Sequence, residues 1–194
     1  MKYTDYQASR DLAWEILIRE GITELPVSVM GICRNLGIDV MVGKIDGSGY
    51  CEEDANGRLV IAISSDDPPM RQRFTAAHEL GHILMGHTDK YHVAYRDPSP
   101  TDDPKEQAVN VFAARLLAPA IVLRDLGVTN SEQIADICKI SMQAAEYRMD
   151  RLQDLYDREK RFLIDRGRSC FGMSPLERKV ERQFRKYIRK HKIL

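Results

Sequence analysis

The residues best suited to chemistry in this sequence are the two histidines and the glutamate of His78-Glu79-Leu80-Gly81-His82. Residues four apart on a helix share a face, so His78 and His82 can bind one metal ion, while Glu79 lies next to a water on that ion. We therefore predict a catalytic Zn²⁺ site with His78 and His82 as ligands and Glu79 as general base. These are the residue types of a zinc peptidase.

The alternative is that these are two ordinary core histidines, because a chain with five histidines sometimes contains this pattern by accident. The flanking sequence argues against it. Apolar residues occur on several faces of the predicted helix, which indicates a buried helix. They are Ala76, Ala77, Leu80, Ile83, Leu84 and Met85. Buried imidazole and carboxylate groups are costly unless they are satisfied, and a metal ion satisfies them.

A third protein ligand is expected, because catalytic zinc sites combine three protein ligands with water. Glu106 is our choice, since it begins the next predicted helix and Asn110 lies one turn on for a supporting hydrogen bond. Asp103 and Glu106 also match a capping box, in which the carboxylate only returns to the backbone. Spacing alone leaves both roles open. The competing third ligands are Asp102, Asp103, His87 and His92.

The elements that would position this site are helices and a small sheet. Periodicity and stop signals predict helices over residues 5–20, 28–36, 66–86 and 105–117, with Asp66 or Asp67 as cap of the histidine helix. Strands are predicted over 38–42, 50–52 and 58–63, with a hairpin turn at Asn56-Gly57, which gives a small antiparallel sheet. An edge strand of this sheet can hold an extended peptide, although an ordinary core sheet fits the residues equally well.

The second half predicts two helices around residues 139–141, a helix-turn-helix-like segment. Residues 131–157 contain three basic and six acidic residues, which disfavours direct DNA reading and favours a packing or substrate-docking role. A last helix begins with a capping box at Ser174 and Glu177 and has an apolar stripe among basic residues. We expect that stripe to dock on the body, with contact to a membrane surface or nucleic acid as the alternative.

Charge divides the chain unevenly. Residues 158–194 contain 13 Lys and Arg against 4 Asp and Glu, whereas the chain before them contains 16 against 25. A basic tail therefore follows an acidic body, which suggests that the tail has an acidic partner: the body itself, another protein or nucleic acid.

Together these features predict an α+β fold: a mostly helical metallopeptidase domain over residues 1–125, then the helix-turn-helix-like segment and basic helix over residues 126–194. The four cysteines, Cys33, Cys51, Cys138 and Cys170, are scattered and form no CxxC pair, which predicts reduced thiols. For Cys51 we expect a small buried residue rather than a latent zinc ligand. No signal peptide or membrane span is recognisable, so we expect a cytoplasmic protein.

Two blocks of sequence resemble a known family. Residues 71–82, RQRFTAAHELGH, and residues 106–119, EQAVNVFAARLLAP, are similar to the ImmA/IrrE family of bacterial metallopeptidases. The resemblance is strong over residues 71–119 and weak over the sheet before them. It implies that Glu106 is the third zinc ligand. Val109 stands where the family usually has alanine, a change that we expect to affect packing more than chemistry.

The resemblance also implies a function. Members of this family cleave a helix-turn-helix repressor, so we expect an endopeptidase that uses Zn²⁺, with Mn²⁺ as a possible activating metal, and a repressor as its partner. Candidates for stabilising the oxyanion are Tyr91, His92, Tyr95 and Tyr147. The alternative is a non-catalytic partner, an antitoxin-like module that associates with a transcription factor. Glu79 favours the enzyme, since a purely structural zinc site needs no general base.

Overall fold

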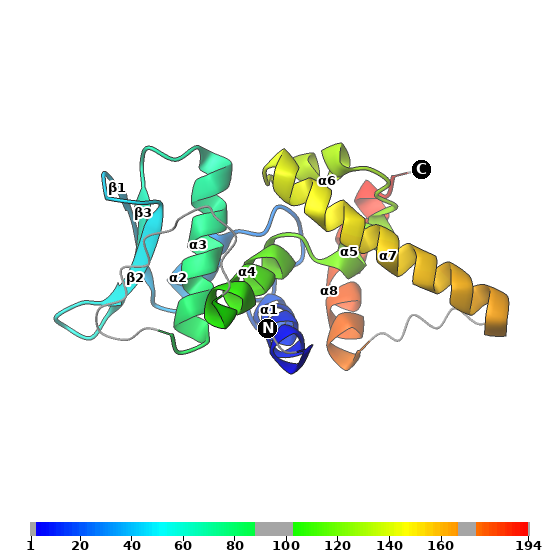
Figure 1. The fold of residues 1–194 in the computed structure, drawn as a ribbon, viewed down its shortest axis with the longest axis horizontal. Coiled ribbons are helices and arrows are strands. Elements are labelled where there is room, and N and C mark those ends of the chain that lie inside the picture. The colour runs from blue at the N-terminus through cyan, green and yellow to red at the C-terminus, as the bar shows by residue number, and fades with distance from the viewer. Residues whose placement is uncertain (1–2, 88–102, 167–173, 194) are drawn as a thin grey trace. The chain divides into compact units, whose positions relative to one another are not determined.

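The computed structural model describes residues 3–87, 103–166 and 174–193, which form two compact units (Figure 1). The first unit comprises residues 1–13 and 27–117, and the second comprises residues 14–26 and 118–194. Helix α1, Tyr3–Arg19, therefore begins in the first unit and ends in the second. These two units do not coincide with the domains predicted from the sequence, residues 1–125 and 126–194. The predicted boundary concerns functional domains, and it stays a prediction.

The first unit places a sheet on one side of helix α3 and helix α4 on the other (Figure 1). Its elements after α1 are α2 (Val29–Asn35), β1 (Asp39–Gly43), β2 (Gly49–Glu53), β3 (Leu59–Ser64), α3 (Pro69–Leu84) and α4 (Pro104–Leu117). Each of these helices and strands was predicted from the sequence to within a few residues. Helix α3 is therefore the central element of this unit, which explains its apolar composition.

The sheet is mixed, so the prediction of an antiparallel sheet is wrong for β1. The strand order is β1-β3-β2, with β1 parallel to β3 and β2 antiparallel to it. The Asn56-Gly57 turn fixes only the β2–β3 hairpin, and it is present, with Gly57 at φ 78°. Strand β3 lies between the other two strands and runs in the same direction as β1. The continuous apolar run of β3 suits this central, buried position.

The second unit is helical. After the end of α1 it contains α5 (Ala120–Leu126), α6 (Ser131–Cys138), α7 (Met142–Arg166) and α8 (Pro175–His191), with α5 packed on α8 and α6 on α7. Lys139, at φ 51°, makes the turn between α6 and α7, and α7 runs well beyond the predicted end near Leu155. The Ser174–Glu177 capping box of α8 is present as predicted.

The two units together confirm the predicted α+β class, mostly helical with a small sheet. Within the described parts of the chain, no helix combines the length and apolar composition that a membrane span requires.

Candidate metal centre

Helix α3 begins without the side-chain cap that the sequence predicted. Its N-cap residue is Pro68, which has no side chain able to accept a hydrogen bond, and Pro69 occupies the first helical position. The prediction of Asp66 or Asp67 as the N-cap is therefore wrong. Proline is tolerated here because the first amide of a helix needs no intrahelical partner.

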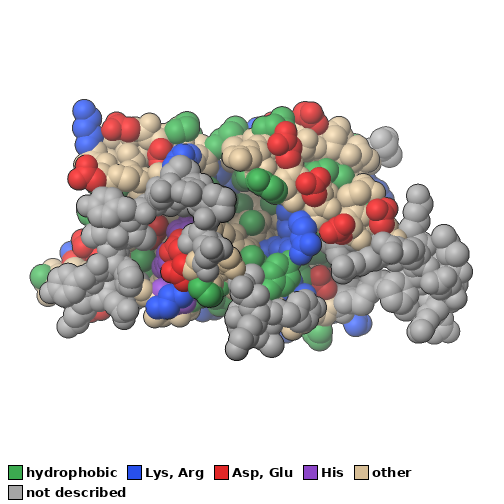
Figure 2. All heavy atoms as spheres, viewed as in Figure 1, with side chains coloured by type: hydrophobic (Ala, Val, Ile, Leu, Met, Phe, Trp, Pro, Cys, Tyr) green, Lys and Arg blue, Asp and Glu red, His purple; other side chains and the backbone are tan. Residues whose placement is uncertain are grey.

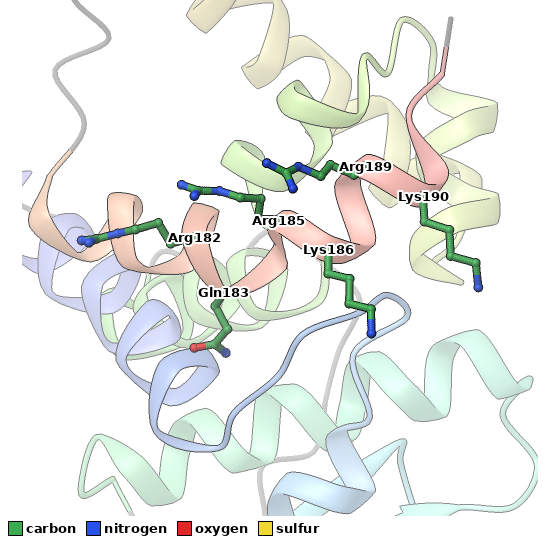
Figure 3. Close-up of a pocket in the computed structure, with 6 residues that line it drawn as sticks. All are labelled: Arg182, Gln183, Arg185, Lys186, Arg189 and Lys190. Carbon is green, nitrogen blue, oxygen red and sulfur yellow. The ribbon is translucent and has the colours of Figure 1, made fainter.

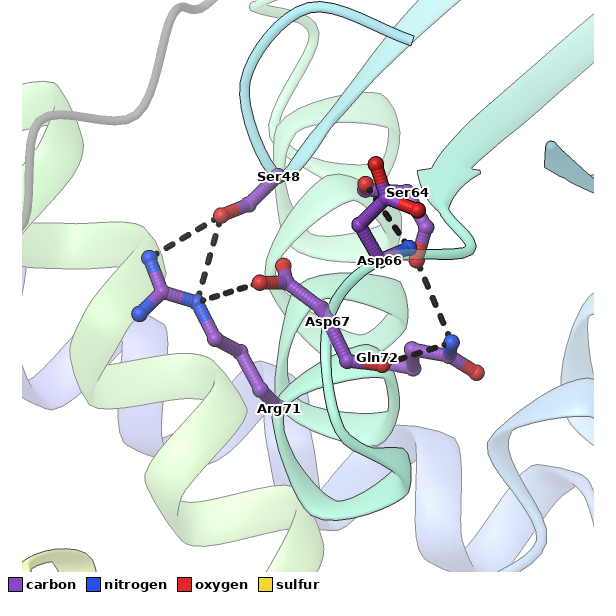
Figure 4. Close-up of polar contacts among 6 residues, drawn as sticks. All are labelled: Ser48, Ser64, Asp66, Asp67, Arg71 and Gln72. Atoms are coloured by element: carbon purple, nitrogen blue, oxygen red, sulfur yellow. Dashed lines mark hydrogen bonds and ion pairs between the residues drawn. The ribbon is translucent and has the colours of Figure 1, made fainter. Parts of the chain in front are cut away.

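A polar network holds the start of α3 against the sheet instead (Figure 4). The Arg71 guanidinium donates to Ser48 Oγ at 3.0 and 3.2 Å and pairs with the Asp67 carboxylate at 3.3 Å. The Gln72 amide donates to the carbonyl oxygens of Ser64, at 3.1 Å, and Asp67, at 2.9 Å. Ser48 precedes β2 and Ser64 ends β3, so these contacts fix α3 relative to both strands.

Strand β2 lies very close to α3 because Gly49 has no side chain. A Cβ atom on Gly49 would lie 2.3 Å from Thr75 Cγ2 and 2.9 Å from the Ala62 carbonyl oxygen, which are impossible contacts. Alternate residues of a strand share a face, so Cys51 projects toward the same side as this contact. Glycine at position 49 thus allows β2 to run along the helix that holds the histidines.

Helix α3 and helix α4 bring three candidate ligands together in the first unit. His78 and His82 are 1% and 7% exposed. The Nε2 atoms of His78 and His82 lie 3.1 Å apart, and the Glu106 carboxylate oxygens lie 3.2 Å from the first and 3.1 Å from the second. Figure 2 shows histidine and acidic side chains next to one another on this face of the first unit.

These distances fit a small cation. A tetrahedral site with bonds of about 2.0 Å to nitrogen and oxygen has ligand atoms about 3.3 Å apart. The two Nε2 atoms are 3.1 Å apart, and each lies 3.1 to 3.2 Å from one of the two Glu106 oxygens. Among the described residues this is the one group of three or more His, Cys, Asp or Glu side chains close enough to hold a metal ion. The donor set, two imidazoles and a carboxylate, is that of several catalytic zinc sites.

Asn110 orients the first histidine, as a supporting residue should. Its Oδ1 lies 3.0 Å from His78 Nδ1. A carbonyl oxygen as partner keeps a proton on Nδ1, so a His78 imidazole that binds a metal would present its Nε2 lone pair on the side of His82 and Glu106. The hydrogen bond predicted for Asn110 is therefore present, and its recipient is a histidine ligand candidate.

Glu106 faces the histidines rather than the helix backbone. The start of α4 is capped by Asp103, whose Oδ1 accepts a hydrogen bond from the Lys105 amide at 2.8 Å. Hydrogen bonds from His78 and His82 hold the pKa of Glu106 well below its usual range, so its carboxylate stays ionised. Of the competing ligands, Asp103 serves as this cap, and Asp102 and His92 lie outside the described residues. The His87 ring lies beside that of His82, with centroids 5.5 Å apart.

Helices α3 and α4 can approach closely because Gly81, which has no side chain, lies at their contact. A Cβ atom on Gly81 would lie 2.9 Å from both Val109 Cγ1 and Phe112 Cδ1. This contact brings the start of α4, with Glu106, within reach of the histidines. Val109, the departure from the family pattern, is fully buried here.

Sequence reasoning did not assign roles to Gly49 and Gly81. A usable signal existed for Gly81, since glycine in a helix interior costs about 1 kcal/mol relative to alanine and needs a compensating reason.

The remaining functional candidate, Glu79, is 1% exposed and has the Cys51 thiol as a hydrogen-bond neighbour. Burial raises the pKa of this thiol well above its usual range, and the nearby Glu79 carboxylate adds to the shift. Cys51 is thus a buried, protonated thiol beside the expected general base. Of the predicted oxyanion-stabilising residues, Tyr147 is exposed on α7, and Tyr91, His92 and Tyr95 lie outside the described residues.

Comparison with known proteins places these residues in a family. The family model Peptidase_M78, described as the IrrE N-terminal-like domain, matches residues 33–150, more than half of the chain. The chain belongs to the ImmA/IrrE family. It is 42% identical over 71 residues to the Radiation response metalloprotease IrrE of Deinococcus radiodurans, a match that covers 34% of this chain and 21% of that protein. Only about a fifth of that relative is therefore spanned. Family membership and the triad of ligand candidates together support a metal cofactor.

Proposed function

We propose that this ImmA/IrrE family member is a zinc-dependent endopeptidase that cleaves a helix-turn-helix transcriptional repressor. His78, His82 and Glu106 are the proposed metal ligands, and Glu79 is the proposed general base. The observation that carries the proposal is the cluster of the two histidine Nε2 atoms and the Glu106 carboxylate, with contacts of 3.1 to 3.2 Å, in the unit where Glu79 is also buried. Mn²⁺ is the second metal to be tested.

The chemistry divides between the metal and the chain. Zn²⁺ bound here would act as a Lewis acid and lower the pKa of a bound water toward 7. Glu79 accepts the proton of the attacking water and passes it to the leaving amine. Asn110 keeps the His78 imidazole in the tautomer that a metal ligand requires.

Strand β2 is suited to hold the substrate, because it is an edge strand of the described sheet. The Ser64 amide donates to the Ser48 carbonyl, and pairing alternates along an antiparallel strand. The backbone groups of Gly49, Cys51 and Glu53 therefore point to the open edge. An extended peptide can pair with them while it runs beside α3.

The repressor substrate is proposed from the family resemblance. The matched relative in Deinococcus radiodurans is named a radiation response metalloprotease, which is consistent with a regulatory substrate. A substrate peptide must be extended to pair with β2, so we expect cleavage in an exposed linker of the repressor rather than within a folded helix.

Glu79→Gln tests catalysis. The variant is incubated with candidate repressors and Zn²⁺ or Mn²⁺. We expect it to retain metal and to cleave about 10²- to 10⁴-fold more slowly, because a general base contributes about that much to the rate. Glu132→Gln, an exposed carboxylate on α6, is the matched control. A wild type that binds metal and associates with a repressor but never cuts it would favour the non-catalytic partner.

Bound metal tests the ligand assignment separately. We expect Glu106→Ala and His78→Ala each to lose zinc, measured by atomic emission after dialysis, while Glu52→Ala keeps it. Full zinc occupancy in Glu106→Ala would remove Glu106 from the ligand set and leave the two histidines to be completed by another residue.

A further inference from the structure

Helix α8 has a strongly cationic outer face. Its 17 residues include seven Lys and Arg but two Glu. The basic residues are all exposed: Arg178, Lys179, Arg182, Arg185, Lys186, Arg189 and Lys190. Glu177 closes the capping box and Glu181 pairs with Arg185 at 3.6 Å. The acidic residues of the helix therefore leave most of its positive charge uncompensated.

The apolar stripe of the same helix is buried inside the second unit. Val180 and Phe184 are fully buried and Ile188 is 9% exposed, in the unit where α8 packs on α5. The Gln183 amide adds hydrogen bonds to the carbonyl oxygens of Leu17, at 2.7 Å, and Ile22, at 2.5 Å. The orientation of α8 in the second unit is fixed, and its basic side chains are held on the opposite side.

The basic side chains form two rows (Figure 3). Arg182, Arg185 and Arg189 extend to one side of the helix, and Lys186 and Lys190 to the other. These five residues and Gln183 line an open cavity of about 510 Å³. At about 1.5 Å per residue, the arginine row is roughly 10 Å long, the axial length of about three phosphates of a DNA strand.

Repulsion along these rows has a cost, since like charges three or four residues apart destabilise a helix. None of the ion pairs among the described residues involves Lys186, Arg189 or Lys190. Such an arrangement is expected where the positive field itself attracts a ligand. A ligand that matches this field is an anion long enough to contact several turns of the helix.

The surface chemistry distinguishes between classes of polyanion. No large hydrophobic residue of α8 is exposed in the described structure, whereas protein interfaces are built around aromatic or aliphatic anchors. A helix lying in a membrane surface inserts its apolar face, but that face of α8 is buried in protein. A phosphate backbone needs neither feature, because Lys and Arg contacts supply its affinity.

Residues 131–157 do not offer such a face, because their three basic residues have other partners. Lys139 pairs with Asp136 at 2.6 Å, and Arg151 with Asp154 at 3.5 Å. Arg148 is buried and donates to the Ala118 carbonyl oxygen at 2.7 Å. The sequence argument against DNA reading concerned this segment, whereas α8 is a separate surface.

We propose that the basic face of α8 binds the phosphate backbone of double-stranded nucleic acid without sequence preference. This binding is independent of the peptidase proposal, since it uses none of the candidate metal ligands and requires no cleavage. Contact to phosphates fixes a protein on a duplex but reads no sequence.

The test measures fluorescence anisotropy of a labelled DNA duplex of about 20 base pairs, between roughly 50 and 200 mM KCl. The full chain carries Glu79→Gln, so that cleavage plays no part. The test variant adds Arg182→Gln, Arg185→Gln and Arg189→Gln. The matched control adds Arg19→Gln, Arg34→Gln and Lys44→Gln, which remove the same charge at exposed positions outside α8. Circular dichroism checks that each variant is folded.

We expect the α8 triple variant to reduce the slope of log affinity against log salt by about 2.7, or about 0.9 per lost phosphate contact. With this difference in slope, raising the salt from roughly 50 to 200 mM weakens duplex binding by the wild type about 40-fold more than binding by the variant. Two duplexes of unrelated sequence should bind equally. The control should keep the wild-type slope.

Three results would overturn the proposal. The first is no binding of the duplex by the parent chain at the lowest salt. The second is an equal loss in the control triple variant, which would mean that net charge and not α8 governs binding. The third is displacement of the duplex by polyglutamate of matched charge at equal or lower concentration, which would identify an acidic protein as the partner.

Discussion

Helices α3 and α8 are of similar length, 16 and 17 residues, but their buried faces differ in kind. Helix α3 buries His78, Glu79 and His82 together with its apolar residues. The buried residues of α8 are Val180, Phe184 and Ile188, and all its Lys and Arg side chains are exposed.

This difference separates what folding requires from what chemistry requires. Burial of apolar side chains stabilises a helix against its unit, as in α8. Burial of histidine and glutamate costs free energy unless the groups find partners, so their presence in α3 indicates a second function for that face. Substitutions in the buried face of α8 should therefore act mainly on stability, and substitutions around the buried polar residues of α3 mainly on metal binding.

The largest effect on stability is expected for Phe184→Ala. Removing a fully buried phenylalanine should reduce the free energy of unfolding by about 3 to 5 kcal/mol, measured by urea denaturation. Zinc affinity below the unfolding transition should equal that of the wild type. An equal loss of zinc affinity would show that the two helices are not separable in function.

A smaller loss of stability is expected for Gly81→Ala, together with a change in the metal site. The added methyl group overlaps Val109 and Phe112, so we expect about 1 to 3 kcal/mol of destabilisation and weaker zinc binding as α4 moves away. Gly43→Ala is the control, because its Cβ would meet open space. Adding Val109→Ala should recover part of the zinc affinity, and no recovery would place the obstruction at Phe112 alone.

The sequence predicted the elements well because their signals are local. Periodic apolar residues, the Asn56-Gly57 turn and the Ser174–Glu177 capping box each act over a few residues. The parallel pairing of β1 with β3 depends on which strand lies in the centre, and that is decided by packing over the whole unit. A local pattern does not contain that information.

The candidate site shows the same limit. The spacing of His78 and His82 places both on one helix face, so their proximity could be predicted. Spacing left Glu106 open between ligand and cap, and its position against both histidine rings became visible only in the structure. The close approaches at Gly49 and Gly81 became visible only when the facing atoms were known, because a glycine in sequence does not name its neighbour.

Asn110→Ala should sharpen the comparison by weakening the metal site with little effect on folding. Loss of the hydrogen bond to His78 Nδ1 should reduce zinc affinity about 10- to 100-fold, the usual effect of removing a residue that orients a ligand. Competition with a chromogenic chelator measures this affinity. Asn35→Ala, at the exposed end of α2, is the control and should leave it unchanged. An unchanged affinity in Asn110→Ala would mean that packing alone orients His78.

The smallest effect is expected for Ser174→Ala at the start of α8. The Ser174 hydroxyl accepts a hydrogen bond from the Glu177 amide at 3.2 Å, and its loss should cost about 1 kcal/mol of stability. Ser174→Asp should retain most of that stability, because its carboxylate can replace the hydroxyl as cap. Neither change touches the basic rows or the metal ligands, so zinc affinity and duplex binding should both match the wild type. A loss of duplex binding in Ser174→Ala at full helicity would show that the first turn of α8, and not only its basic face, contacts the nucleic acid.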